Sequence, residues 1–154
     1  MSKELDAFRT NFRLDDLTVH ESERWILSIR PAQLTLASMV LSSKLGHLSF
    51  SEMDSQDFEE MGTMIAEAEH VATDLFGAVR INAVCLMMKD PIVHFHILPR
   101  YEFTKDAFGR PWVDADWPGP PNMGGEVVKD EIVLQELVGV IRTELNELHP
   151  AGEH

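Results

Sequence analysis

The chain has 154 residues, and its 26 acidic against 13 basic side chains give a formal net charge of −13. This length favours a single domain over residues 1–154, and a hydrophobic content of 44% is too high for a disordered chain. The acidity argues against nucleic acid or an anionic membrane as a partner, while the lone cysteine excludes an internal disulfide framework and favours a cytoplasmic location.

The beginning of the chain predicts an arm followed by a pair of strands. Residues 1–21 mix charged and apolar residues and are expected to form an N-terminal arm, as a short helix or irregular chain. Residues 23–30 and 34–43 are strand-like, and Pro31-Ala32 between them is typical of a turn. Residues 44–47 then form a loop.

A long helix is predicted over residues 55–76, because apolar side chains recur there every three or four positions. Asp54 or Ser55 can cap its start, and Gly77 lies where a helix-ending glycine is common. The stripe consists of Phe58, Met61, Ile65, Ala68, Ala72 and Leu75.

The second half predicts two more strands and a second helix. Residues 79–88 and 92–100 are strand-like, and residues 129–148 carry a helical apolar stripe. Sheet strands combined with two amphipathic helices indicate the α+β class, with a mostly antiparallel sheet and helices packed on one face.

Residues 101–128 form a long loop, rich in proline, glycine and aspartate, before the last helix. Twenty-eight residues exceed an ordinary connection, which suggests function or an interface. Its Trp112 and Trp117 are suited to stacking on a base or, with better fit to a polar loop, to burial in a dimer interface.

The strand at residues 92–100 carries the most informative pattern. Side chains alternate between faces along a strand, so His94 and His96 share one face and lie side by side. Imidazoles act as nucleophiles, acids, bases and metal ligands near neutral pH. An alternative is that the pair lines a solvated face of the sheet and has no chemical role. A metal site would need further ligands, for which the nearby candidates are Glu102, His47 and Asp90.

His94-Phe95-His96-Ile97-Leu98-Pro99-Arg100 resembles the latter part of the histidine triad (HIT) signature, His-φ-His-φ-His-φ-φ, where φ is apolar. The surrounding MMKDPIVHFHILPRYEF is similar to a bacterial branch described as diadenosine polyphosphate hydrolase-like. The order of strands, helix and histidine strand extends the resemblance over about residues 22–120.

The resemblance implies a HIT-like nucleotide hydrolase or nucleotidyl transferase that acts on dinucleoside polyphosphates or nucleoside phosphoramidates. His94 falls on the nucleophile, which would form a nucleotidyl-histidine, and His96 on a histidine that contacts phosphate. Asn82, Arg100 and His47 are candidate substrate contacts. Asn82 is equally suited to a local hydrogen bond, and Arg100 to pairing with an acid. The resemblance implies a homodimer and no cofactor or metal.

Three positions depart from the family pattern. Ile92 stands where the first triad histidine is expected, although its backbone carbonyl can still hold the ring of His94. Residues 88–91 (MKDP) replace a Gly-Gln-Ser/Thr-like loop, and residues 44–47 (KLGH) replace Lys-Arg-His. These departures predict reduced or altered activity. The alternatives are a nucleotide-binding protein with lost or weak turnover and a His-x-His metal protein.

Overall fold

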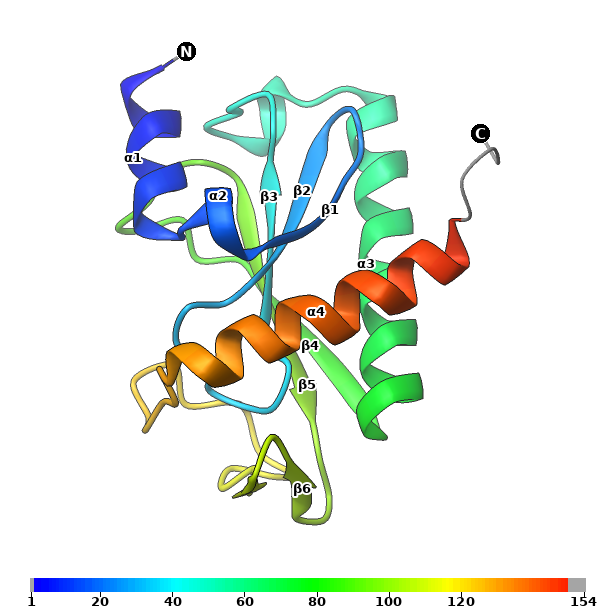
Figure 1. Ribbon diagram of the computed structural model, residues 1–154. Coiled ribbons are helices and arrows are strands. Elements are labelled where there is room, and N and C mark those ends of the chain that lie inside the picture. Colours follow the sequence, from blue (N-terminus) through cyan, green and yellow to red (C-terminus); the bar gives the residue numbers. More distant parts are fainter. Residues whose placement is uncertain (1, 150–154) are drawn as a thin grey trace.

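A five-stranded antiparallel sheet, in the order β1-β2-β3-β5-β4, organises the chain (Figure 1). The computed structural model describes residues 2–149, so residues 1 and 150–154 of the predicted domain lie outside the described residues. The strands of the main sheet are β1 (Thr18–Glu21), β2 (Trp25–Ile29), β3 (Met39–Ser43), β4 (Arg80–Val84) and β5 (His94–Arg100). The predicted α+β class with an antiparallel sheet is confirmed.

Two long helices cover one face of this sheet (Figure 1). They are α3 (Ser55–Phe76) and α4 (Glu131–Leu148), and three short helices complete the set, namely α1 (Lys3–Asn11), α2 (Leu14–Leu17) and η1 (Phe50–Glu52). Helix α3 has the predicted bounds because Asp54 forms a capping box with Asp57 and Gly77 ends the helix at φ +71°. No helix in residues 2–149 is both long and apolar enough to cross a membrane.

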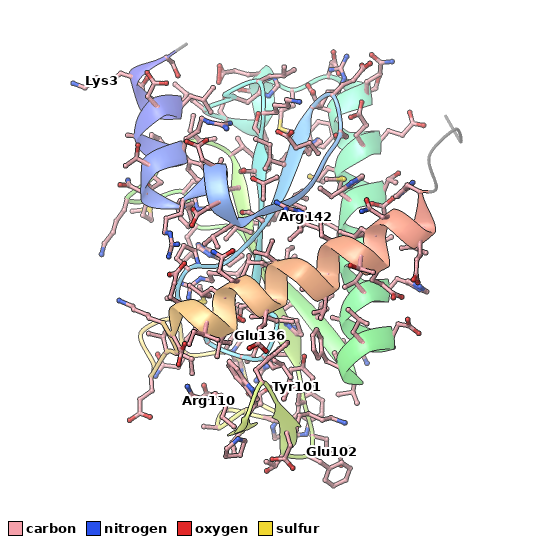
Figure 2. The ribbon with its side chains drawn as sticks, in the orientation of Figure 1. Lys3, Tyr101, Glu102, Arg110, Glu136 and Arg142 are labelled. Atoms are coloured by element: carbon pink, nitrogen blue, oxygen red, sulfur yellow. The ribbon has the colours of Figure 1, made fainter. Side chains whose placement is uncertain are left out.

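The main core lies between the sheet and these two helices. Leu27 of β2 pairs with Leu41 of β3, and both are fully buried beneath the helices. The buried seam of α3 centres on Met64 and Val71, whereas Phe58, which the sequence pattern placed in the stripe, is 41% exposed. On α4, Arg142 donates to the backbone oxygen of Thr18 at 2.6 Å, which fixes the helix over β1 (Figure 2).

The opposite face of the sheet is partly covered by the N-terminal segment. Helix α1 is an ordered helix whose start is capped by the Ser2 side chain. A second apolar cluster forms there from Leu5, Phe8, Leu14, Ile26, Val40 and Ile92. The side chain of Ile92 is therefore fully buried beneath α1.

All four predicted strands are shorter in the structure, and the residues freed from two of them form loops beside the sheet. β3 begins only at Met39, because the buried amide of Gln33 ties the preceding turn together. Its Nε2 donates to the backbone oxygens of Arg30 and Ser38, both at 2.8 Å, and its Oε1 accepts from the Ser38 amide at 2.9 Å. β4 ends at Val84, so that residues 85–93 form a loop leading into β5.

The long segment at residues 101–128 contains a small hairpin of β6 (Lys105–Ala107) and β7 (Arg110–Trp112). Tyr101 precedes it and donates from its hydroxyl to Leu36 O at 2.8 Å (Figure 2). Trp112 is 6% exposed, belongs to the main core and donates to Ala107 O at 3.0 Å. The expectation that Trp112 faces a base or a second subunit is wrong, because its own chain already buries the indole.

Candidate functional site

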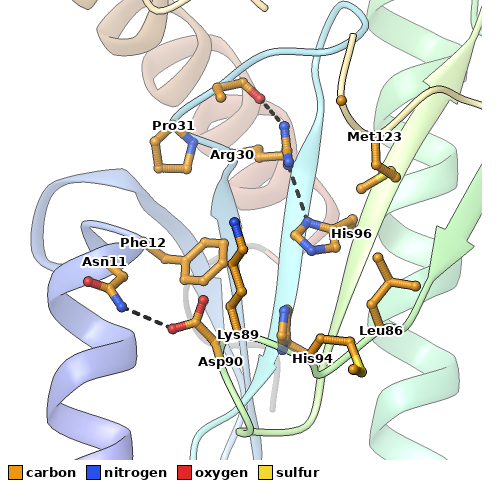
Figure 3. A pocket seen from close by; sticks show the side chains of 13 residues that line it. Asn11, Phe12, Arg30, Pro31, Leu86, Lys89, Asp90, His94, His96 and Met123 are labelled. Carbon is orange, nitrogen blue, oxygen red and sulfur yellow. Dashed lines mark hydrogen bonds between the residues drawn. The ribbon is translucent and has the colours of Figure 1, made fainter.

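A cavity of about 510 Å³ opens on the sheet face that carries α1 (Figure 3). It is bounded by the end of α1, the turn after β2, the loop before β5 and the segment around Met123. His94 and His96 line it from β5 and are only 3% and 8% exposed. The cavity therefore places both imidazoles in a partly desolvated space with an opening to solvent.

His94 is held by the backbone of Ile92. Its Nδ1 lies 2.6 Å from the carbonyl oxygen of Ile92, and because a carbonyl only accepts, Nδ1 is the protonated ring nitrogen. Nε2 is then unprotonated and carries a lone pair. Burial lowers the pKa of His94, against a smaller opposing effect of the Ile92 contact, so the ring is neutral near pH 7.

His96 has the opposite arrangement of its ring proton. The Nε of Arg30 donates to His96 Nδ1 at 3.2 Å, and a guanidinium cannot accept a hydrogen bond. Nδ1 is therefore the acceptor, and Nε2 carries the hydrogen. Burial, together with the positive charge of Arg30, lowers the pKa of His96 to about 4, so this ring is also neutral at pH 7.

The two rings form a complementary pair. Their centroids are 5.1 Å apart and their planes meet at 78°. His94 offers a lone pair at Nε2, and His96 offers an N–H at the same ring position. This arrangement can deliver a nucleophile to an electrophilic centre while donating a hydrogen bond to an oxygen attached to that centre.

Arg30 is a functional candidate that the sequence analysis did not single out. It is half-buried at the end of β2, and its Nη1 donates to Ala32 O at 2.6 Å. Within residues 2–149 it makes no ion pair with a carboxylate, and burial lowers the pKa of its guanidinium. A charged residue directly after a mostly apolar strand and before a proline is the signal that the sequence offers. In this acidic protein, a half-buried cation facing a cavity favours an anionic ligand.

The N-terminal helix supplies an aromatic wall to the cavity. Phe12 lies 5.5 Å from the His94 ring and 6.1 Å from the His96 ring, and it stacks on Phe8 at 4.4 Å. Asn11 donates to Asp90 at 2.9 Å and so joins α1 to the loop before β5 (Figure 3). The sequence predicts only an arm here, because no local pattern indicates which part of the sheet this segment meets.

His47 is not brought to this cavity. Its Nδ1 lies 2.9 Å from the Ser43 hydroxyl and its Nε2 3.5 Å from Asp57, at the start of α3. Ser43 shares the helix-covered face of the sheet with Trp25 and Leu27, so the His47 ring lies on the side opposite to His94 and His96.

Asn82 and Arg100 are brought together, but with each other rather than with the two histidines. Arg100 Nη1 donates to Asn82 Oδ1 at 2.7 Å, and its Nε and Nη2 bind Asp114 at 2.7 and 3.1 Å. Both partners of this ion pair are almost fully buried, with side chains 4% and 2% exposed. Asn82 and Arg100 lie further along the sheet face that carries the two histidines. There they line a separate cavity of about 480 Å³, together with Trp117.

Because Arg100 is neutralised within the fold, its ion pair is expected to matter for stability more than for the chemistry of the histidine cavity. Asp114→Ala should lower the free energy of unfolding by about 3–5 kcal/mol, because it leaves a buried charge uncompensated. Urea unfolding checks this, with Asp106→Ala in the hairpin as a control. A cost below about 1 kcal/mol would contradict the structural role of the pair.

The metal alternative is not supported by the surroundings of the two histidines. A metal ion bound by the two histidines would lie close to the positive charge of Arg30, which already donates to His96 Nδ1. Within residues 2–149, the groups of three potential metal ligands are His20, Glu67 and His149, and His70, Asp74 and Glu144. Neither group contains His94 or His96.

Comparison with known proteins gives structural similarity without close sequence similarity. No protein-family model and no curated protein matches the chain. Among solved structures, a hypothetical histidine triad nucleotide-binding protein from Sulfolobus tokodaii superposes with a TM-score of 0.66 at 16% identity, covering 91% of this chain and 90% of that one.

Two bacterial structures agree with it. A histidine triad protein from Marinobacter aquaeolei has a TM-score of 0.63 at 18% identity and covers 90% of this chain and 95% of its own. One from Bradyrhizobium japonicum has a TM-score of 0.64 at 16% identity, with 85% and 92% covered. The chain therefore has the fold of the histidine triad proteins, as the motif at residues 94–100 predicted.

Proposed function

We propose that the protein is a nucleotide hydrolase or nucleotidyl transferase that uses His94 as its nucleophile. The observation that carries this proposal is the hydrogen bond from His94 Nδ1 to Ile92 O, which leaves Nε2 as a lone pair in a cavity shared with His96 and Arg30. The proposed substrate class is a dinucleoside polyphosphate or a nucleoside phosphoramidate. The fold shared with histidine triad proteins supports this class.

The proposed reaction has two displacement steps. His94 Nε2 forms a bond to the α-phosphorus, and the bond from phosphorus to the leaving group breaks with its electron pair going to the leaving group. Water then attacks the nucleotidyl-histidine, which releases the nucleotide, restores the imidazole and delivers a proton to solvent. In this mechanism, the Nε2–H of His96 and the remaining donors of Arg30 stabilise the phosphate oxygens, where negative charge gathers.

The rest of the cavity is suited to an aromatic base. Phe12, Leu86 and Met88 line it alongside the polar groups, and Lys89 of the loop before β5 lines it as well (Figure 3). Apolar walls with a few convergent donors are typical of small-molecule sites. Under this proposal, Asn82, Arg100 and His47 have structural rather than substrate-binding roles.

The proposal is tested by turnover. Incubation with diadenosine tetraphosphate or adenosine phosphoramidate is expected to release adenine nucleotide. A rapid quench in alkaline denaturant, which preserves a phosphorus–imidazole bond, is expected to trap the radiolabelled nucleotide on the protein. The alternative of a binding protein with little turnover predicts AMP binding by calorimetry without product. If the protein neither binds nor turns over any of the nucleotides tested, both the enzyme and the binding-protein versions are contradicted.

Restoring the missing triad histidine is expected to harm the protein. Ile92 is fully buried among Leu5, Phe8 and Val40, so Ile92→His places an imidazole where it has no polar partner. We expect a loss of about 2 kcal/mol or more in unfolding free energy and no gain in turnover. Ile92→Val, which removes one methylene, should cost about 1 kcal/mol and serves as the matched control. A stable and faster Ile92→His variant would contradict this reading of the first triad position.

We also propose that the protein is a homodimer, as the family resemblance implies. β4 lies at the outer end of the sheet, and an open strand edge can pair with another chain. Light scattering on the purified protein should give twice the mass of one chain. A single-chain mass at micromolar concentration would contradict the proposal.

A further inference from the structure

A second group of potential ligands lies outside the histidine cavity, where three elements meet. His20 comes from β1, Glu67 from the middle of α3, and His149 from the residue that ends α4. His149 Nε2 lies 2.6 Å from Glu67 Oε1, and His20 Nε2 lies 3.6 Å from Glu67 Oε2. One carboxylate is thus flanked by two imidazoles, each presenting the same ring nitrogen to a different oxygen.

The two imidazoles are aligned with each other. Their rings are 7° from parallel, with centroids 5.0 Å apart. One nitrogen from each ring and one oxygen of Glu67 all lie within 4.8 Å of one another. Side chains from three separate elements therefore converge on one small volume.

The carboxylate itself has an unsatisfied oxygen. Glu67 Oε2 is buried without a hydrogen-bond partner, and the Glu67 side chain is only 14% exposed. A buried carboxylate oxygen without a hydrogen bond costs free energy, and a cation bound beside it would remove that cost. The orphaned oxygen is an observation independent of the spacing of the histidines.

We infer that His20, Glu67 and His149 form a site for a zinc ion. Two imidazole nitrogens and a carboxylate oxygen are a donor set that zinc favours, with water as a fourth ligand. Bonds of about 2.0–2.2 Å in a tetrahedral site place ligand atoms about 3.3 Å apart. The two contacts of Glu67, at 2.6 and 3.6 Å, bracket that separation, so small rotations of the side chains suffice.

The site would act as a cross-link between the end of α4, the middle of α3 and the edge strand β1. An ion that binds only the folded state stabilises it in proportion to its occupancy. The site uses none of the residues assigned to the histidine cavity, so it does not rest on the proposed function.

The test is zinc titration of the metal-free full-length protein in competition with a chromophoric chelator. Wild-type protein should bind one equivalent of zinc, and zinc should raise its melting temperature. His20→Ala and His149→Ala should each weaken binding beyond the roughly 10- to 100-fold that loss of an outer-shell partner costs, because each removes a direct ligand. Glu67→Gln should also weaken binding while nearly keeping the side-chain volume.

Two control variants make the result specific. His70→Ala changes the neighbouring exposed group of His70, Asp74 and Glu144, and His94→Ala changes the cavity pair. Both should bind zinc like the wild type. Unchanged binding in His20→Ala and His149→Ala would overturn the inference, as would loss of the zinc equivalent in either control. Melting curves without zinc establish that each variant is folded.

Discussion

Replacing His94 with alanine is expected to abolish nucleotide release, with a loss of at least about 10³-fold in kcat/KM. The variant removes the only side chain in the proposed mechanism that forms a bond to phosphorus. His96 and Arg30 stay in the cavity, so calorimetric binding of AMP should change far less than turnover. The measurement is the steady-state release of AMP from a diadenosine polyphosphate.

His94→Ala tests the nucleophile assignment only if the cavity keeps its shape in the variant. His94 lies 5.1 Å from the Phe8 ring, so its truncation also removes packing under α1. His94→Asn, which keeps a hydrogen-bond donor near Ile92 O, should be equally inactive but more stable. His70→Ala, an exposed change on α3, is the matched control and should keep full turnover. Residual activity within tenfold of the wild type in both His94 variants would refute the nucleophile assignment.

The second large effect is expected at Arg30, which contacts His96 and adds a donor to the cavity. Arg30→Met removes both the hydrogen bond to His96 Nδ1 and the nearby positive charge. We expect turnover to fall by about 10²-fold, the cost of losing one donor to developing negative charge. Arg30→Lys keeps a charge without the guanidinium geometry and should recover only part of that loss.

A pH titration separates this role from a merely structural one. In the wild type, His96 has a pKa of about 4 and remains neutral down to about pH 5. Because the Arg30 charge contributes to that depression, its removal should raise the pKa toward the ordinary value of 6.5. Imidazole NMR signals should show His96 protonating at higher pH in Arg30→Met than in the wild type. An unchanged His96 titration would disprove the assigned contact.

Some features of this fold can be predicted from the sequence because residues close together in the chain determine them. Helix α3 begins and ends as predicted, since its capping residues and its closing glycine act within one turn of the backbone. His94 and His96 share a face because alternation is a property of any strand. The motif at residues 94–100 also predicted the HIT-like fold at an identity of only 16–18% to the solved structures compared.

Other features depend on contacts between residues far apart in the chain. Arg30 meets His96 across 66 positions, and Arg100 meets Asp114 rather than an adjacent acid. The loop after β3 places His47 on the sheet face opposite to His94, although both histidines lie near strand ends. A single sequence shows which residues are able to make such contacts, but it does not show which residues pair with each other.

By itself, the amino-acid sequence determined the α+β class, the bounds of the longest helix and the common face of the two central histidines, because short-range backbone geometry and periodicity decide these. Only the tertiary structure decided that Ile92 packs beneath α1, that the arm is a helix with an aromatic wall, and that a half-buried arginine orients His96. The physical reason is that burial and hydrogen-bond partnership are set by which surfaces meet in three dimensions. Contacts between distant segments produce no repeating pattern in the sequence from which they could be predicted.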